Sequence, residues 1–276
     1  MERRTLVLLL AIATAIACAA AWLVLNPPGR RGAETVGSST TSHPLPPFHL
    51  LAVEGNVDVT LVEGTTEGAT VDLPSRGAAT VTLEVRGDTL TVQGGESRRW
   101  WQRFGAAGAR QPRVTVAFRQ LDGISLAGNV RLRATSIRAP ALTITAKGAA
   151  ALRIENLDTD LLRLTGAGAI KADVAGRATE QRIELAGAGI FRGAELAGQR
   201  VRVAVSGAGK ASVKAAEALD VAISGAGSVD YSGDPRVTQQ ISGAGKIRRR
   251  SADDGGPVRA RVATMALPGG SSALPG

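Results

Sequence analysis

The chain has 276 residues and 44% of them are hydrophobic, so it is long enough and apolar enough to bury a core. Its 34 Gly, 3% aromatic residues and single Cys exclude a disulfide framework, a cysteine-based zinc site and a core packed mainly by aromatic rings. The two His precede the first strand-like segment, which excludes most histidine-based catalysis and metal binding, and the formal net charge is +9.

The first 25 residues are typical of a targeting segment. Arg3 and Arg4 precede an uncharged run over residues 6–25, which is long for a secretory signal and close to the length of a membrane-spanning helix. A cleaved signal peptide and an uncleaved N-terminal membrane anchor both fit, and Cys18 after Ala17 adds lipid attachment as a third interpretation. All three predict an exported protein of the periplasm or cell surface, and an anchor would hold it at the inner membrane through residues 6–25.

Two segments without apolar periodicity flank the body of the chain. Residues 26–46 are rich in Pro, Gly, Ser and Thr, which predicts a flexible linker. Residues 248–276 combine five Arg with Gly and Pro, which predicts a disordered basic tail. The body between them, residues 47–247, is expected to form one domain.

The body opens with segments in which apolar and polar residues alternate strictly, as in half-buried strands. Gly87-Asp88 stands between two of them and predicts a tight turn. This strand-rich opening is expected to cap the structure that follows it, because an unprotected end strand invites edge-to-edge pairing. The segments are 57–61, 69–73, 81–85, 90–92 and 114–118.

A basic and aromatic segment at 94–113 interrupts the opening. Arginine next to tryptophan is typical of interface hot spots and membrane-surface anchors, so this segment is the candidate contact with a partner. The alternative is that Trp100 or Phe104 folds back as a lid over an open end while the arginines stay solvated. The candidate contact residues are Arg98, Arg99, Trp100, Trp101, Arg103 and Phe104.

The basic charge is concentrated in the tails and in this segment. Residues 47–247 hold 24 basic and 20 acidic side chains, and the segment 94–113 alone accounts for the excess. In the rest of the domain the numbers of basic and acidic residues are equal, which argues against a broad basic face and against a specific nucleic-acid partner.

The second part of the body, from about residue 120, repeats with a period near 20. Glycines recur at 128, 148, 168, 189, 209, 227 and 245, and an apolar–x–apolar triplet precedes most of them. A unit of this size with one or two short strands cannot bury its own apolar face, but stacked copies can. The pattern predicts an all-β parallel β-helix, or β-solenoid, with coils of about 20 residues and a glycine at each sharp bend.

The glycine-rich stretches do not predict a cofactor or metal site. The segment 187–193 is similar to a loosened dinucleotide fingerprint, but no helix pattern follows it and Gly-Ala-Gly occurs four more times. Gly209-Lys210 lacks the Ser or Thr and the first Gly of a phosphate-binding loop. Calcium-binding repeats need an Asp in every turn, which is missing here. We therefore expect no cofactor.

The motifs GNVDVTLVEG (55–64), RGDTLTV (86–92) and the tandem SGAG turns resemble the "putative auto-transporter adhesin, head GIN domain" family. The resemblance covers about residues 47–247 and implies an exported protein with a right-handed parallel β-helix. It implies no catalytic residues. The insert at 94–113 and the Arg-rich stretch 248–250 depart from the family pattern.

The sequence therefore favours a non-catalytic module of the cell envelope that works in binding, adhesion or structure. Its expected partners are an envelope glycan, an anionic lipid surface or another protein, with no specific nucleic acid. The alternative is a carbohydrate-active β-helix enzyme, which would need clustered carboxylates in a groove. The nearest candidates for such a cluster are Asp158, Asp160, Asp173, Glu180 and Glu184.

Overall fold

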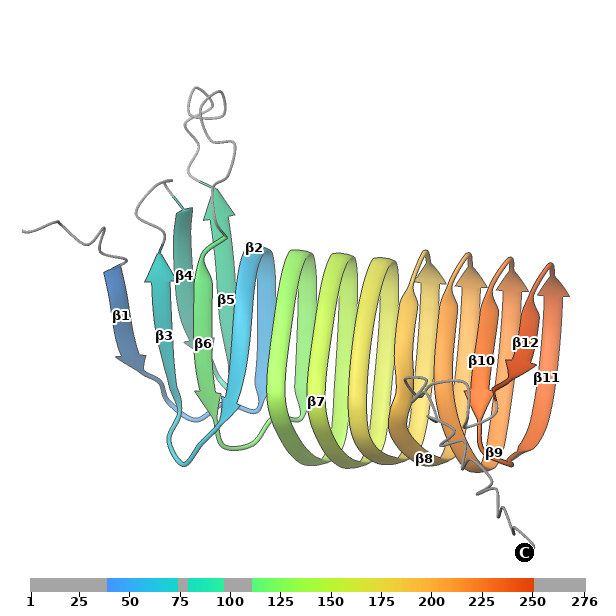
Figure 1. Cartoon of the computed structure of the whole chain (residues 1–276). Coiled ribbons are helices and arrows are strands. Elements are labelled where there is room, and N and C mark those ends of the chain that lie inside the picture. The colour runs from blue at the N-terminus through green and yellow to red at the C-terminus, as the bar shows by residue number, and fades with distance from the viewer. Residues whose placement is uncertain (1–38, 74–78, 97–110, 251–276) are drawn as a thin grey trace, which may run out of the picture. The chain divides into compact units, whose positions relative to one another are not determined.

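The computed structural model describes residues 39–73, 79–96 and 111–250, and these residues form an all-β fold without helices (Figure 1). Their twelve strands belong to one sheet, whose main path is β1-β3-β6-β2-β7-β8-β9-β10-β12. The strands are β1 (Ser39–Pro44), β2 (Leu50–Glu63), β3 (Gly68–Leu73), β4 (Ala79–Arg86), β5 (Thr89–Glu96), β6 (Arg113–Phe118), β7 (Gly123–Gly187), β8 (Ile190–Gly207), β9 (Lys210–Gly225), β10 (Ser228–Ser232), β11 (Arg236–Gly243) and β12 (Lys246–Arg249).

From β7 onward the chain pairs in parallel with the segment about 20 residues away. Val203 lies beside Ile183 on one side and beside Val221 on the other, and Gln239 continues the same row on β11. In Figure 1 the ribbon of β7 winds through successive turns, and β8 and β9 continue them. Equivalent residues of successive turns therefore lie side by side, and we call one such turn a coil.

A column of glycines marks one corner of the coils, and we call it the glycine ladder. Each of these residues has a positive φ, and a Cβ on most of them would meet the carbonyl oxygen of the preceding ladder glycine within about 3 Å. Both the backbone angle and the close approach therefore exclude a side chain, as the sequence predicted for the bends. The ladder consists of Gly55, Gly128, Gly148, Gly168, Gly187, Gly207, Gly225 and Gly243.

The ladder corrects the repeat register expected from the sequence. Gly168 stacks on Gly187, whereas the sequence pattern aligned it with Gly189, so the alignment was wrong by two residues from this coil onward. The cause is that Gly-Ala-Gly occupies different positions in different coils. At 166–168 the ladder glycine is the last of the three residues, whereas at 187–189 it is the first.

The other glycine of each motif leaves room inside the corner. A Cβ on Gly166 would lie 3.3 Å from side-chain atoms of both Ile170 and Leu185. In the next coil the large residue precedes the corner instead, and a Cβ on Gly189 would lie 3.2 Å from Leu185. In the coils that contain Gly-Ala-Gly, one large residue fills this space, and the second glycine stands on the side that the large residue does not occupy.

The opening strands form the N-terminal end of the sheet. The first half of β2 pairs in parallel with β5 and its second half with β6, and β4 and β3 then pair with these two strands in antiparallel fashion. All five predicted opening segments are strands, and the turn at Gly87-Asp88 joins β4 to β5. This arrangement agrees with the prediction of a strand-rich opening at one end of the repeats.

The core runs between the two faces of the coils and is almost entirely aliphatic. Three phenylalanines are fully buried, and the remaining buried apolar side chains are Leu, Ile, Val and Ala. Parallel pairing places equivalent inward residues of successive coils in contact, which explains how a chain with few aromatic residues still buries a continuous core. The three phenylalanines are Phe48, Phe118 and Phe191.

No helix among the described residues is long and apolar enough to cross a membrane. The predicted targeting segment, residues 1–25, lies outside the described residues, as do most of the linker and of the tail. The bounds predicted for the linker and the tail were wrong at their inner ends, because residues 39–44 form β1 and residues 248–249 belong to β12, and both strands pair with the sheet.

Candidate functional site

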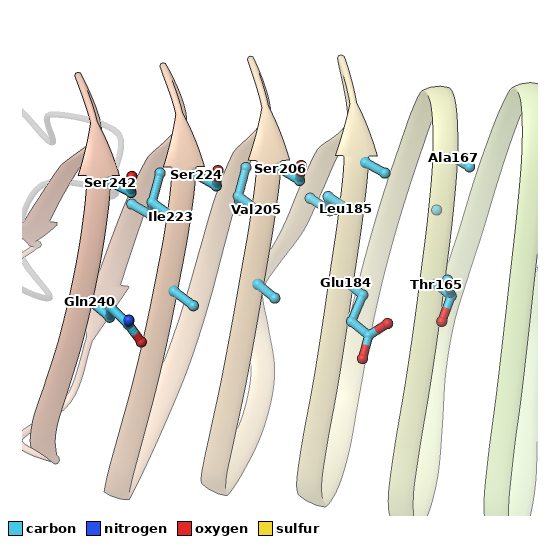
Figure 2. A pocket seen from close by; sticks show the side chains of 14 residues that line it. Thr165, Ala167, Glu184, Leu185, Val205, Ser206, Ile223, Ser224, Gln240 and Ser242 are labelled. Atoms are coloured by element: carbon cyan, nitrogen blue, oxygen red, sulfur yellow. The ribbon is translucent and has the colours of Figure 1, made fainter.

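A shallow hollow of about 410 Å³ lies on the outer face of the strands that lead into the glycine ladder, and we call it the furrow. Its outward side chains occupy two positions of each coil, one residue and three residues before the ladder glycine. Figure 2 shows Ser206, Ser224 and Ser242 in one row, and Thr165, Glu184 and Gln240 in the other. The same two positions on successive coils therefore build one continuous surface.

The furrow exists because its outward side chains are small. Ala, Ser and Thr cover little of the sheet, so the strands form its floor between the longer Glu184 and Gln240. Its polar groups are hydroxyls, one carboxamide and one carboxylate. Such groups can accept and donate hydrogen bonds to an extended polar chain that lies across the strands.

Glu184 is the one carboxylate among the described residues that line the furrow. Hydrolysis of a glycosidic bond ordinarily uses a pair of carboxylates on either side of the bond. None of the other acidic residues considered from the sequence lines the furrow. Asp173 follows the ladder corner and therefore stands on the opposite face from Glu184. The structure does not bring these carboxylates together in a groove.

Several of these acidic groups form ion pairs instead. Asp173 accepts a hydrogen bond from Arg192 at 3.0 Å, Glu180 is 2.7 Å from a nitrogen of Arg182, and Asp158 is 3.5 Å from Arg177. In addition, no group of three or more His, Cys, Asp or Glu in the described part of the chain is placed to hold a metal ion.

The segment proposed as a partner contact enters and leaves the sheet at a ladder corner. Gly94 pairs with Gly55 and Arg113 with Asp58, so 18 residues connect two positions that two residues connect in β2. The return of the chain is fixed by Gln111, which donates a hydrogen bond to Asn56 at 2.5 Å and accepts one from Arg131 at 3.1 Å. Asn129 donates a second hydrogen bond to the same Asn56 oxygen at 2.9 Å.

The candidate contact residues themselves, Arg98, Arg99, Trp100, Trp101, Arg103 and Phe104, lie outside the described residues. The furrow was missed by sequence reasoning. Its signal was present as the recurring small residues before each ladder glycine, but the shifted register hid which of them stand in one row.

The chain is similar to known structures along most of its length. It shares 20% identity and a TM-score of 0.71 with the crystal structure of a putative adhesin from Bacteroides fragilis, covering 78% of this chain and 97% of that one. A putative adhesin from Parabacteroides merdae gives 20% identity and a TM-score of 0.59, over 77% of this chain and 96% of that one. These likenesses support the fold.

A third similar structure is described as a putative lipid binding protein, from Parabacteroides distasonis. Its identity is 16% and its TM-score 0.60, with 78% of this chain and 97% of that chain covered. No curated protein matches the sequence. The family model for "Putative auto-transporter adhesin, head GIN domain" matches residues 47–235, which is more than half of the sequence. The chain therefore belongs to the putative auto-transporter adhesin, head GIN domain family.

Proposed function

We propose that this protein is an exported, non-catalytic β-solenoid of the bacterial cell envelope that binds or adheres through the repeated surface of its coils. The observation that carries the proposal is the furrow, in which equivalent side chains of successive coils line one open hollow with a single carboxylate. Membership of a family described as adhesins supports the proposal, as does the similar structure described as a lipid binding protein.

The finer description of the fold is part of the proposal. Coils of 18–20 residues, measured between successive ladder glycines from Gly128 on, pair in parallel and enclose an apolar core, which supports a β-solenoid. Parallel strands joined by a crossover are almost always connected in the right-handed sense, which supports a right-handed coil. We place the domain at residues 47–247, and export rests on the charged start and the apolar run over residues 6–25.

The basic and aromatic segment remains our proposed second contact. The described residues on either side of it, Gly94 and Arg113, pair with the two sides of a ladder corner in β2, and its composition combines arginine with tryptophan. Such a segment would add contacts to a partner that the coils already hold.

Co-sedimentation of the full chain with isolated envelope components tests the proposed function. The panel contains peptidoglycan sacculi, an acidic polysaccharide, and anionic and neutral liposomes. A second protein carries Ser in place of Arg98, Arg99, Trp100, Trp101 and Arg103. We expect the unchanged chain to sediment with at least one component, and the variant to sediment less.

Each outcome decides one part of the proposal. Equal binding by both proteins would keep the binding module and remove the segment from it. An absence of binding by either protein would contradict the proposed function and leave a structural envelope protein as the better account.

The enzyme alternative has its own test. The full chain and a Glu184→Gln variant are incubated with the same polysaccharide, and new reducing ends are measured. We expect none from either protein. Release by the unchanged chain, abolished in the variant, would establish the carbohydrate-active enzyme.

A further inference from the structure

The face opposite the furrow carries two rows of outward residues in which basic side chains predominate. The outward residues on this side stand three and five positions after each ladder glycine, and the buried residue between them points into the core. From β7 to β12 these two rows hold eight basic side chains, and we call them the basic face: Arg131, Arg133, Arg153, Lys171, Arg192, Lys210, Lys246 and Arg248.

This grouping corrects the expectation drawn from the charge sum. The sequence predicted no broad basic face, since basic and acidic residues balance outside the segment 94–113. The numbers of basic and acidic residues balance, but their distribution over the surface does not, because the register places basic residues of six coils in two adjacent rows. The equivalent rows of the furrow face hold, in the same coils, only Lys147 and Glu184 as charged groups.

The two aspartates in the basic rows do little to neutralise them. The Asp173 carboxylate lies between Arg192 at 3.0 Å and Lys171 at 4.0 Å. Asp230 lies between Arg248 at 3.0 Å and Lys210 at 3.5 Å, and its side chain is 1% exposed. Each carboxylate is thus shared by two cations from neighbouring coils, while those cations are about half exposed. The surface that meets solvent is therefore positive.

The shape of the basic face favours a linear partner. Neighbouring strands are about 4.8 Å apart, so the rows repeat at close to the length of one sugar in an extended chain and run across all the coils. A face that docks on a membrane ordinarily adds exposed aromatic or aliphatic side chains. In the two rows of the basic face, Ile190 is the one large hydrophobic residue that is exposed. Sheets that bind single-stranded nucleic acid stack bases on aromatic rings, which these rows lack.

We propose that the basic face binds a linear acidic polysaccharide lying across the coils, through charge pairing with the exposed arginines and lysines. The inference rests on the proposed binding through the coils, and it adds a surface opposite the furrow together with the partner class of that surface. Binding of this kind weakens steadily as salt concentration rises, since each exposed charge pair is screened.

The test uses the full chain and two variants of equal net charge. The first changes Arg133, Arg153 and Lys246 of the basic face to Gln. The matched control changes Lys147, Arg163 and Arg202, which are exposed on the furrow face, to Gln. In both sets one of the three side chains pairs with an exposed carboxylate, Glu155 or Asp220. Circular dichroism melting confirms that both variants fold.

Affinity for polygalacturonate is measured at several salt concentrations, with dextran as the neutral probe. We expect the unchanged chain to bind polygalacturonate and not dextran, the basic-face variant to bind roughly tenfold more weakly, and the control to bind like the unchanged chain. Equal losses in both variants would overturn the proposal, because they would show a response to net charge alone.

Two further probes separate the alternatives. Tighter binding to anionic vesicles, or to single-stranded DNA, with the same loss in the basic-face variant would overturn the assignment to a polysaccharide. If the chain sediments with envelope components but ignores polygalacturonate, this inference fails and the proposed function stands. If it binds polygalacturonate through the basic face but no envelope component, the proposed function fails and the site stands.

Discussion

The opening strands and the coils use the same kinds of residue for different purposes. In the opening, β3 and β4 pair in antiparallel fashion with β6 and β5, and a glycine turns a hairpin. In the coils every strand pairs in parallel, and glycine serves both the turn and the stacking of one coil on the next. Within the described residues β11 pairs with β9 alone, and all its residues are exposed. The sheet thus ends in antiparallel pairs on one side and, on the other, in the parallel strand β11, whose residues are all exposed.

The largest expected difference separates the two uses of glycine. Gly168 has φ +115° and a Cβ there would meet the Gly148 carbonyl oxygen at 2.4 Å, so Gly168→Ala should lower the free energy of unfolding by at least about 3 kcal/mol. Gly87 has φ +57° with no atom near its Cβ position, so Gly87→Ala should cost about 1 kcal/mol. Urea unfolding of both variants measures the difference, and equal losses would contradict the stacking role.

The second comparison follows one inward position from a covered coil to the open end. Ile223 and Ile241 are paired neighbours in the same row, but Ile223 is 2% exposed and Ile241 is 41% exposed. Ile223→Ala should lower the free energy of unfolding by about 2–4 kcal/mol, because it leaves a cavity. Ile241→Ala should cost less than about 1 kcal/mol, since water already reaches the site. A similar cost for both would mean that the end is not open in solution.

The third comparison concerns the two carboxylates that link neighbouring coils. Lys210→Gln with Arg248→Gln would leave the buried Asp230 without a cation, and we expect a loss of about 2 kcal/mol. Lys171→Gln with Arg192→Gln should cost less than about 1 kcal/mol, because Asp173 is part-exposed and water solvates it. Thermal or urea unfolding of the two double variants tests this order, and its reversal would contradict the role of burial.

The smallest expected effect tests the open edge itself. An exposed strand with apolar side chains can pair with the edge of another molecule, and a lysine on it opposes such pairing. Ile241→Lys should therefore reduce concentration-dependent association in sedimentation velocity. Ile190→Lys is the control, because Ile190 is similarly exposed but lies on an outer face with strands on both sides. An equal reduction by the control would show general surface charge as the cause.

Much of this fold can be predicted from the sequence because its signals are local. Strict alternation gives the opening strands, and Gly-Ala-Gly gives the corners. The register could not be predicted from the motif, because the same Gly-Ala-Gly sequence stands differently at 166–168 and at 187–189. In the first coil the large residue follows the ladder glycine, and in the second it precedes it. The two-residue shift in register becomes visible only in the packing of Ile170 and Leu185 beside the glycines of the motif. The family could be recognised from the motifs, which the match over residues 47–235 confirms.

The candidate site was less accessible to sequence reasoning. A charge sum cannot show a face, because residues 20 apart become neighbours only through the register. Arg133 and Arg153 lie in one row by this means, and the furrow depends on the same alignment of Ser206 with Ser224. The basic and aromatic segment was prominent because its residues are adjacent in sequence, and its contact role stays a prediction.

The corner between Gly94 and Arg113 shows how this architecture can acquire new parts. Eighteen residues connect two positions that two residues connect in β2, yet the pairing on either side keeps the same alignment with β2. Lengthening such a connection costs little additional closure entropy. Ladder corners are therefore natural grafting points, at which a foreign peptide or an epitope tag could be displayed without altering the scaffold that carries it.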